Sequence, residues 1–454
     1  MTESSLAART AAGRTARKQV SRTSTGEWSP PADRRDPIAI LEKQALTRVP
    51  ALVPIRYGRM AASEFAFLRG APAIMASDLS LSPNTGLTVQ LCGDAHLSNF
   101  GVYASPERRL VFDLNDFDET LPGPFEWDVK RLTASIAVAA RGNGFKDACG
   151  QDAARDAARA YRLTMAQLAG MGELDVWYQA ADAQTLLELA KRPRGRKALE
   201  TTFADAERHT SVQALRKLTQ PGPDGTPRIK YQPPLVVPYA ELGFDRNSEE
   251  EIVRRVFTDY RSTLQEDRKD LLDRFRYVES AMKVVGVGSV GTRCAMSLLL
   301  GETIGSPLFL QVKEAEESVL APYLKASRYE HQGHRVVAGQ RLMQASSDIF
   351  LGWASGPEGR FFYVRQLRDM KGSAVVANLD QALLRRYSEL CGQTLARAHA
   401  RSGDRVAIAA YLGRGDSFDT AMARWALAYA DQTRTDHQAL LAAIKNGRVM
   451  SVEA

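Results

Sequence analysis

The sequence feature that most constrains this chain lies in residues 92–128, where acidic side chains stand at the ends of short apolar segments. Asp94 and Asn99 are five residues apart near its start. The apolar run 110–112, typical of a buried strand, leads into a second cluster that contains Asp113, Asp116, Asp118 and Glu119. Carboxylates gathered in this way repel one another unless a cation or a proton neutralises them. The stretch therefore favours a site for a metal ion and a general base over a solvated loop.

Composition describes an ordinary globular protein. The chain has 454 residues, 44% of them hydrophobic and 25% charged, and this length suggests about two or three domains. It has no apolar run of the ~18 residues that a membrane helix needs, and no apolar core of a secretory signal at its start. The cysteines lack the CxxC spacing of metal or redox sites; they are Cys92, Cys149, Cys294 and Cys391. A reduced cytoplasm is the expected location.

The excess positive charge is concentrated at the N-terminus. Of the net charge of +7, residues 1–35 carry +4, from seven Arg or Lys against three acids, in a segment rich in Ser, Thr and Ala. With almost no large apolar residues to bury, this basic tail is predicted to be disordered. Contact with nucleic acid or acidic lipid is one role for it, and a solvated tail is the favoured one. Nucleic acid is not expected to be a partner of the remainder.

Hydrophobic periodicity and breaker residues indicate mixed secondary structure. Helices are expected over 38–48, 60–68, 130–141, 153–171, 185–191, 249–276, 329–344 and 383–400, and strands over 87–91, 110–112, 308–312 and 361–364. The Pro- and Gly-rich stretch 221–234 indicates a hairpin or a lid-like loop. Arg56, Arg59 and Arg69 flank the second helix as candidates for holding phosphates, although surface pairs and carboxylate clamps are the commoner roles of such arginines.

A Gly-x-Gly-x-x-Gly turn follows an apolar segment at residues 286–291. The dinucleotide-binding fingerprint is written in the same way, so the motif alone is weak. Two observations favour a turn that covers phosphates. The segment after it ends at Gly301, which is short for a crossover helix, and the strand 308–312 delivers Lys313 as a phosphate-pairing lysine. The expected phosphate-binding residues are Gly286, Gly288, Ser289, Gly291 and Lys313.

The spacing of Asp94 and Asn99, followed by a strand that ends in Asp-Phe-Asp, resembles the catalytic and metal-binding loops of the protein-kinase-like superfamily. The motif Gly-Asp-Ala-His is more similar to that of aminoglycoside and choline phosphotransferases, although Cys92 occupies the position where those enzymes have His. The resemblance implies that Asp94 takes the proton of the substrate, and that Asn99 and Asp116 hold Mg²⁺. The reserve candidates for the metal are Asp113 and Asp118.

The same resemblance assigns supporting roles. It implies that an acid holds Lys313 in place, and the candidates are Glu330, Glu316 and Glu317. Gln366 marks a hinge where adenine would meet the backbone. Asp128 is expected to cap a helix and to brace the catalytic loop. His96 is either a metal ligand or, as the favoured role, a hydrogen-bonding brace of that loop.

With RYGRMAASEFAFLRG before the acidic stretch and GPFEWDVKRL after it, the chain is identified as a member of the bacterial family called domain of unknown function 2252, over residues 37–440. Its motif order is rotated relative to kinase-like chains, which implies a circularly permuted, two-lobed kinase-like α+β fold. The larger, mostly helical lobe would comprise 36–277, with a helical insertion at 150–275, and 371–454. The small antiparallel-sheet lobe would comprise 278–370.

The function implied is an ATP- and Mg²⁺-dependent phosphotransferase that acts on a hydroxyl acceptor. Only about ten residues separate Asp118 from Asp128, which leaves no room for a long activation segment and favours a small-molecule acceptor. Three further functions stay open: protein nucleotidyl transfer in the same cleft, a non-catalytic ATP-binding sensor, and a metal-dependent hydrolase. No motif identifies the acceptor or the oligomeric state.

Overall fold

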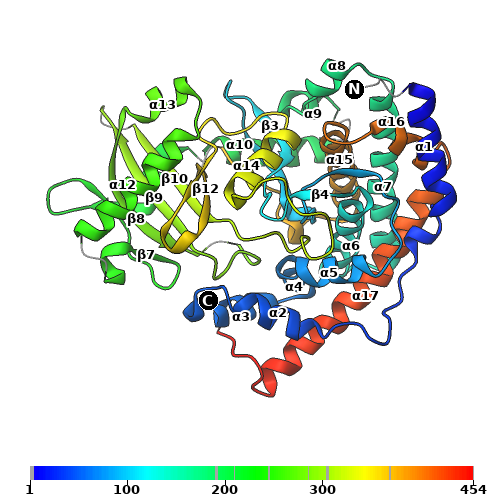
Figure 1. Cartoon of the computed structure of the whole chain (residues 1–454), viewed down its shortest axis with the longest axis horizontal. Coiled ribbons are helices and arrows are strands. Elements are labelled where there is room, and N and C mark those ends of the chain that lie inside the picture. The colour runs from blue at the N-terminus through cyan, green and yellow to red at the C-terminus, as the bar shows by residue number, and fades with distance from the viewer. Residues whose placement is uncertain are drawn as a thin grey trace.

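An antiparallel sheet and a bundle of helices lie side by side in the computed structural model (Figure 1). The structure describes residues 5–189, 193–208, 210–243, 246–284, 286–302, 306–367 and 370–452. We call residues 210–367 the sheet region, and residues 5–208 with 370–452 the helical region. The protein is thus an α+β protein, as the sequence predicted. In the part of the chain that the structure describes, no helix is long and apolar enough to cross a membrane.

The core of the helical region is built from four long helices. They are α6 (Glu126–Gly142), α7 (Asp147–Ala169), α15 (Gln381–Ala400) and α17 (Ser417–Lys445). Small residues let these helices approach closely: a Cβ placed on Gly392 of α15 would collide with the carbonyl oxygen of Ala157 in α7. Glycine is therefore required at this crossing, and α7 and α15 pack tightly beside the acidic stretch.

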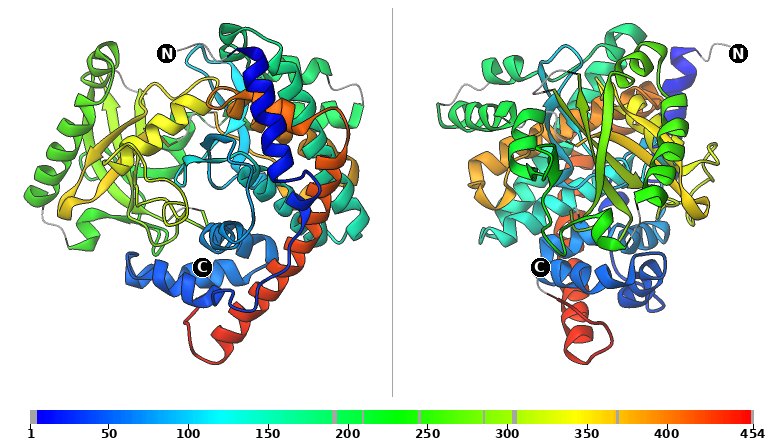
Figure 2. Two further views of the ribbon diagram at one scale, coloured as in Figure 1. Left: turned by 45° about the vertical axis from the view of Figure 1, so that its right-hand side comes forward. Right: turned by 90° about the vertical axis from the view of Figure 1, so that its left-hand side faces the viewer.

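The N-terminal segment is ordered, so the prediction of a disordered tail over 1–35 is wrong for the described residues. Helix α1 (Leu6–Gln19) packs along α16 (Arg405–Leu412) on the outside of the helical region (Figure 2). A Cβ on Gly13 would collide with the carbonyl oxygen of Ala407. Small residues make this contact at close range. A prediction based on large apolar side chains does not detect a helix surface of this kind.

The sheet region contains a six-stranded antiparallel sheet in the order β11-β12-β10-β9-β8-β7. Its strands are β7 (Val236–Pro238), β8 (Phe275–Lys283), β9 (Cys294–Gly301), β10 (Pro307–Glu314), β11 (Gly352–Ser355) and β12 (Phe361–Gln366). Two apolar clusters pack on it, one with Tyr260 of α12 (Arg246–Ser262) and one with Ala214 of α11 (Ser211–Leu218). Every residue of the central strand β10 is buried, Lys313 included.

The glycine turn joins β8 to β9, which pair antiparallel. A dinucleotide-binding turn would instead open a helix behind a parallel strand, so the dinucleotide interpretation is wrong. Gly286 and Gly291 have φ angles of +62° and +92°, which favour glycine. The turn contacts the segment that contains Val49, whose main-chain nitrogen donates to the carbonyl oxygen of Gly291 at 2.8 Å.

Two short ribbons frame the acidic stretch. In the first, β1 (Thr88–Leu91) pairs with β4 (Leu121–Pro124); in the second, β2 (Phe100–Ala104) pairs with β3 (Leu110–Leu114). The main-chain nitrogen of Gln90 in β1 donates to the hydroxyl of Ser402 at 2.9 Å. The residues that follow α15 therefore adjoin the strand that enters the acidic stretch.

The remaining elements are smaller. They are α2 (Pro37–Ala45), α3 (Val53–Ala61), α4 (Glu64–Gly70), α5 (Pro72–Ser80), α8 (Glu173–Trp177), α9 (Ala183–Leu189), α10 (Pro193–Arg208), α13 (Glu266–Leu272), α14 (Gln332–Met343), β5 (Thr219–Pro221) and β6 (Pro227–Ile229). The Pro- and Gly-rich stretch forms the β5–β6 hairpin, one of the two predicted forms.

Several predicted helices differ from the structure at their ends, three of them as follows. The helix expected over 60–68 is two helices, because Ser63 caps α4 by accepting from the main-chain nitrogen of Ala66. The helix expected over 249–276 ends at α13, and β8 has begun by Phe275. The helix expected over 185–191 is α9, and its predicted end at 191 lies outside the described residues.

Candidate functional site

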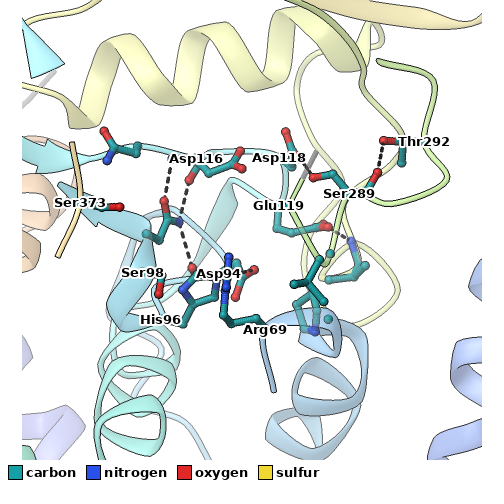
Figure 3. A pocket seen from close by; sticks show the side chains of 18 of the residues that line it. Arg69, Asp94, His96, Ser98, Asp116, Asp118, Glu119, Ser289, Thr292 and Ser373 are labelled. Carbon is teal, nitrogen blue, oxygen red and sulfur yellow. Dashed lines mark hydrogen bonds and ion pairs between the residues drawn. The ribbon is translucent and has the colours of Figure 1, made fainter. Parts of the chain in front are cut away.

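A cavity of about 1180 Å³ lies where the sheet region meets the helical region. Segments that are far apart in sequence form its wall: the acidic stretch, the glycine turn, the N-terminal helices and residues 371–379 (Figure 3). Predicted site residues on this wall are Asp94, His96, Asn99, Asp116, Asp118, Gly286, Gly288 and Ser289. The two halves of the predicted site are thus brought together by the tertiary structure.

Lys313 connects the sheet to the acidic stretch. It is 2% exposed, and its Nζ lies 3.3 Å from Oδ2 of Asp116 and forms a second ion pair with Oδ2 of Asp118. The hydroxyl of Tyr363, on the neighbouring strand β12, donates to the other oxygen of Asp118 at 2.7 Å. A buried lysine with two carboxylates is a strongly coupled cluster whose charges stabilise one another.

The two aspartates of this cluster are not equivalent. Burial by itself raises the pKa of a carboxyl group, and with the adjacent charge of Asp116 it raises the pKa of Asp118. Burial also acts on Asp116, but the charges of Lys313 and Arg365 outweigh it and hold the pKa of Asp116 below its ordinary value. Asp116 therefore keeps its negative charge at neutral pH.

One oxygen of Asp116 could take a metal ion. Oδ1 of Asp116 is enclosed and has no hydrogen-bond donor among the described residues. No three His, Cys, Asp or Glu residues in the described part of the chain form a metal-binding group. Mg²⁺ commonly takes only one or two carboxylates and completes its shell with phosphate oxygens and water. Oδ1 of Asp116 could meet a metal held in this way, whereas the side-chain oxygens of Asn99 and Asp118 already have partners within the protein.

Asn99 ties the two acidic loops together. Its side-chain nitrogen donates to the carbonyl oxygens of Asp94 and Asp116, both at 2.9 Å, and its side-chain oxygen accepts from the main-chain nitrogen of Asp116 at 2.7 Å. Replacing this amide would release both loops at once. Asn99 therefore fixes the relative position of Asp94 and Asp116.

Among the described residues, Asp94 is anchored through one of its carboxylate oxygens. Oδ1 accepts from Nε of Arg131 at 2.8 Å, and Arg131 is itself held by a hydrogen bond of 2.7 Å to the carbonyl oxygen of Leu68. Nε2 of His96 lies 3.7 Å from Oδ2, too far for a hydrogen bond. Burial lowers the pKa of His96 to about 4, so this ring is neutral at pH 7. The side chain of Asp94 is 20% exposed, and its second oxygen is left to meet a ligand in the cavity.

Asp128 braces the loop that carries Asp94. Its carboxylate accepts from the main-chain nitrogens of Cys92 at 2.8 Å and Gly93 at 3.1 Å. Nε2 of His399, in the last turn of α15, lies 3.2 Å from the same carboxylate. Asp128 is buried in the first turn of α6, so it joins the loop to two of the long helices.

Asp113 lies away from the cavity. It is fully buried, and its Oδ1 lies 2.9 Å from a guanidinium nitrogen of Arg397. The main-chain nitrogens of Leu114 and Ala345 donate to its two oxygens at 2.9 and 2.8 Å. Both oxygens are therefore occupied within the protein, and Asp113 is not a metal ligand in this arrangement.

The expected partner of Lys313 is also corrected. Glu330 is exposed and precedes α14, which begins at Gln332 rather than at 329. Arg335 is one of the buried residues of α14 and donates to three carbonyl oxygens, those of Asp118 at 2.9 Å, Thr120 at 2.7 Å and Glu316 at 2.8 Å. The aspartates pair with Lys313 in place of a glutamate.

Two contacts hold the glycine turn in place. The hydroxyl of Ser289 lies 3.5 Å from Oδ2 of Asp118, which places the turn against the acidic stretch. The guanidinium of Arg59 donates to the carbonyl oxygen of Gly286 at 2.7 Å and supports the turn from α3. Gln366 ends β12, and its role as a hinge stays a prediction.

Sequence reasoning missed several residues of the site. Arg131 follows Asp128 by three residues on α6, and this helical spacing was a usable signal. Arg365 reaches the acidic stretch from β12, which no local pattern indicates. Glu119 was named in the acidic cluster but was given no role; burial raises its pKa to about 7, and its carboxylate accepts from the main-chain nitrogen of Val319 at 2.7 Å.

These features define an α+β protein with a cavity between an antiparallel sheet and a helical region, lined by an acidic loop and a glycine turn. The chain belongs to the family described as an uncharacterized protein conserved in bacteria, domain of unknown function 2252, whose model matches residues 48–443. This match confirms the family membership inferred from the sequence. No curated protein and no solved structure is significantly similar to the chain.

Proposed function

We propose that the protein is an ATP- and Mg²⁺-dependent phosphotransferase with a circularly permuted kinase-like fold, acting on a hydroxyl group of a small molecule. The observation that carries this proposal is the ion pair between Lys313 and Asp116, at 3.3 Å, beside a cavity lined by Asp94 and the glycine turn. A strand-borne lysine, an acid with an oxygen to spare and a candidate base are the parts that phosphoryl transfer needs.

The order of elements supports the kinase-like interpretation. A glycine turn joins β8 and β9, the lysine lies on the following strand β10, a helix follows as α14, and β12 ends at the expected hinge. The hydrogen bond between Gln90 and Ser402 places the end of α15 next to β1. An unpermuted chain would continue at this point, so the rotated motif order requires no break in the architecture.

The roles follow from the contacts. Main-chain groups of the glycine turn and the ammonium of Lys313 would hold nucleotide phosphates, and Asp116 with Asn99 and Asp118 would hold the metal. Bound Mg²⁺ would supply positive charge that offsets the charge on the phosphates. Because Lys313 is already neutralised by two aspartates, we expect nucleotide binding to redistribute these ion pairs.

Asp94 would act as the general base. Arg131 fixes one carboxylate oxygen and leaves the other toward the cavity. The proton of the acceptor hydroxyl would pass to this oxygen while the hydroxyl oxygen bonds to the phosphorus atom and the bond to the nucleotide leaving group breaks.

The test is product analysis with purified full-length protein, Mg²⁺ and ATP labelled at either the alpha or the gamma phosphate, incubated with a bacterial metabolite extract. Transfer of the gamma label to an acceptor supports the proposal. Transfer of the alpha label would instead support nucleotidyl transfer, and nucleotide binding without any transfer would support a sensor. The Asp94→Ala variant is the control for contaminating kinases.

A further inference from the structure

Three arginines on the N-terminal side of the cavity have incomplete hydrogen bonding among the described residues. Arg48, Arg56 and Arg69 all line the cavity, and their guanidinium groups form no ion pair with a carboxylate of the described residues. We propose that these arginines form a subsite for an oxyanion of the acceptor, a phosphate ester or a carboxylate. This inference rests on the proposed function and extends it to the class of substrate.

Their hydrogen bonding is incomplete. Arg48 is 7% exposed and donates to the carbonyl oxygen of Val290, while its Nε has no partner among the described residues. Arg56 is fully buried and donates through Nη2 to Gly70 and Gln44, but its Nε and Nη1 have no acceptor in that same part of the chain. A buried guanidinium nitrogen without an acceptor lowers the stability of the folded protein, unless a ligand supplies the accepting oxygen.

Arg69 extends this group toward the reactive residues. Its Nε is likewise buried without an acceptor among the described residues, and its side chain lies beside Asp94 (Figure 3). Its carbonyl oxygen lies 3.2 Å from where a Cβ on Gly288 would be, so the end of α4 sits under the glycine turn. The subsite is therefore continuous with the proposed centre of transfer.

Two buried arginines elsewhere, Arg162 and Arg335, meet acceptors within the protein, although the Nε of buried Arg397 also has no acceptor among the described residues. Arg162 meets Asp419 at 2.7 Å, and Arg335 donates to three carbonyl oxygens. Burial, with the neighbouring charge of Arg48, lowers the pKa of Arg56 to about 9. An anion placed between these side chains would relieve both the missing hydrogen bonds and the repulsion.

The size of the cavity leaves room for two ligands. Its volume of about 1180 Å³ exceeds the ~300–1,000 Å³ usual for a single small-molecule site. A nucleotide bound between Lys313 and the glycine turn would leave the arginine side for the acceptor. The acceptor class that fits is a small molecule with a hydroxyl to face Asp94 and an anionic group to face Arg69.

The experiment measures binding of inorganic phosphate and of malonate to the full-length protein by calorimetry, without turnover. We expect binding of at least one anion, retained when a non-hydrolysable ATP analogue with Mg²⁺ saturates the protein. Arg69→Gln should weaken it by about 10–100-fold, because each lost hydrogen bond to a charged group contributes on that scale. Phosphate and malonate distinguish a phosphate ester from a carboxylate.

Controls separate this inference from the proposed function. Lys313→Ala should lose binding of the ATP analogue and keep binding of the anion. Arg434→Gln removes the same charge from an exposed pair with Glu64 and should leave anion binding unchanged. Arg48→Lys keeps the charge should Arg48→Gln fail to fold. Absence of anion binding, competition by the ATP analogue, or full binding in Arg69→Gln would each overturn the subsite.

Discussion

Buried ion pairs in the helical region and in the cavity are built differently. Arg34 donates four hydrogen bonds of 2.7–2.8 Å to Asp78 and Asp436 in the helical region. In the cavity, one oxygen of Asp116 has no donor among the described residues, and Arg69 has no carboxylate there. In the structural pair, the charged groups have their hydrogen-bond partners within the protein. In the cavity, some polar atoms have no such partner and are available to a ligand.

The largest effect expected is catalytic. Asp94→Ala should lower turnover by about 10²–10⁴-fold, because a general base contributes on that scale, while nucleotide affinity changes little. The melting temperature should fall because Arg131 is left buried without its carboxylate, so turnover is compared at a temperature where both proteins are folded. Asp267→Ala, on an exposed acid of α13 outside the cavity, is the matched control. Turnover in Asp94→Ala equal to that of the wild type would remove the base assignment, once gamma-label transfer has been measured.

A second effect separates two aspartates that are close in sequence. Asp116→Ala should raise the Mg²⁺ concentration needed for activity by at least about tenfold, since removing even an indirect partner of a metal costs ~10–100-fold in affinity. Asp113→Ala should lower stability instead, because it leaves Arg397 buried without its carboxylate. Magnesium titrations of both variants test this, and the reverse result would reassign the metal ligand.

Stability should respond most in the helical region. Arg162→Ala leaves Asp419 buried without its partner, so the free energy of unfolding should fall by about 3–5 kcal/mol. Arg155→Ala, on the same helix, removes an exposed pair with Asp416 and should cost less than about 1 kcal/mol. Chemical denaturation measures both, and equal losses would contradict the distinction between the two kinds of pair.

A pH effect distinguishes an acid of the cavity wall from the paired acids of the helical region. Burial raises the pKa of Glu119 from 4.5 to about 7, so the folded state binds a proton more tightly than the unfolded state between these values. The contribution of Glu119 to the free energy of unfolding is therefore fully present at low pH, and it is lost as the pH rises through about 7. Glu119→Gln should flatten the slope of stability against pH across this window, measured by chemical denaturation. An unchanged slope would contradict the shift.

The smallest effect concerns the N-terminal helix. Gly13→Ala forces a Cβ against Ala407 and should destabilise the α1 contact by about 1–3 kcal/mol, as overpacking does. Activity should be unaffected because α1 lies outside the cavity. Gly142→Ala, where the added Cβ meets no atom within 4 Å, is the control. Identical melting temperatures for the two variants would show that α1 is not docked.

Much of the fold was predictable from local patterns. The strands that contain residues 88–91, 110–112, 308–312 and 361–364 were confirmed, because apolar runs bounded by turn residues are local signals. Errors fell at boundaries, such as the helix expected over 249–276, where β8 follows α13 closely. Helix α1 was missed because it packs through small residues such as Gly13 and through arginine contacts such as that of Arg17 with the carbonyl oxygen of Tyr411.

By itself, the sequence determined the chemical inventory of the site: the acids and the amide of residues 94–118, the glycine turn, and a lysine on a buried strand. These groups can be recognised in the sequence because they are particular residue types at fixed local spacings. Only the tertiary structure decided which of them meet. Asp113 lies within strand β3 and turns into the protein, whereas Asp116 follows the strand and faces Lys313. Nor does spacing show that Arg131 fixes Asp94, because such a contact joins segments whose separation is set by packing.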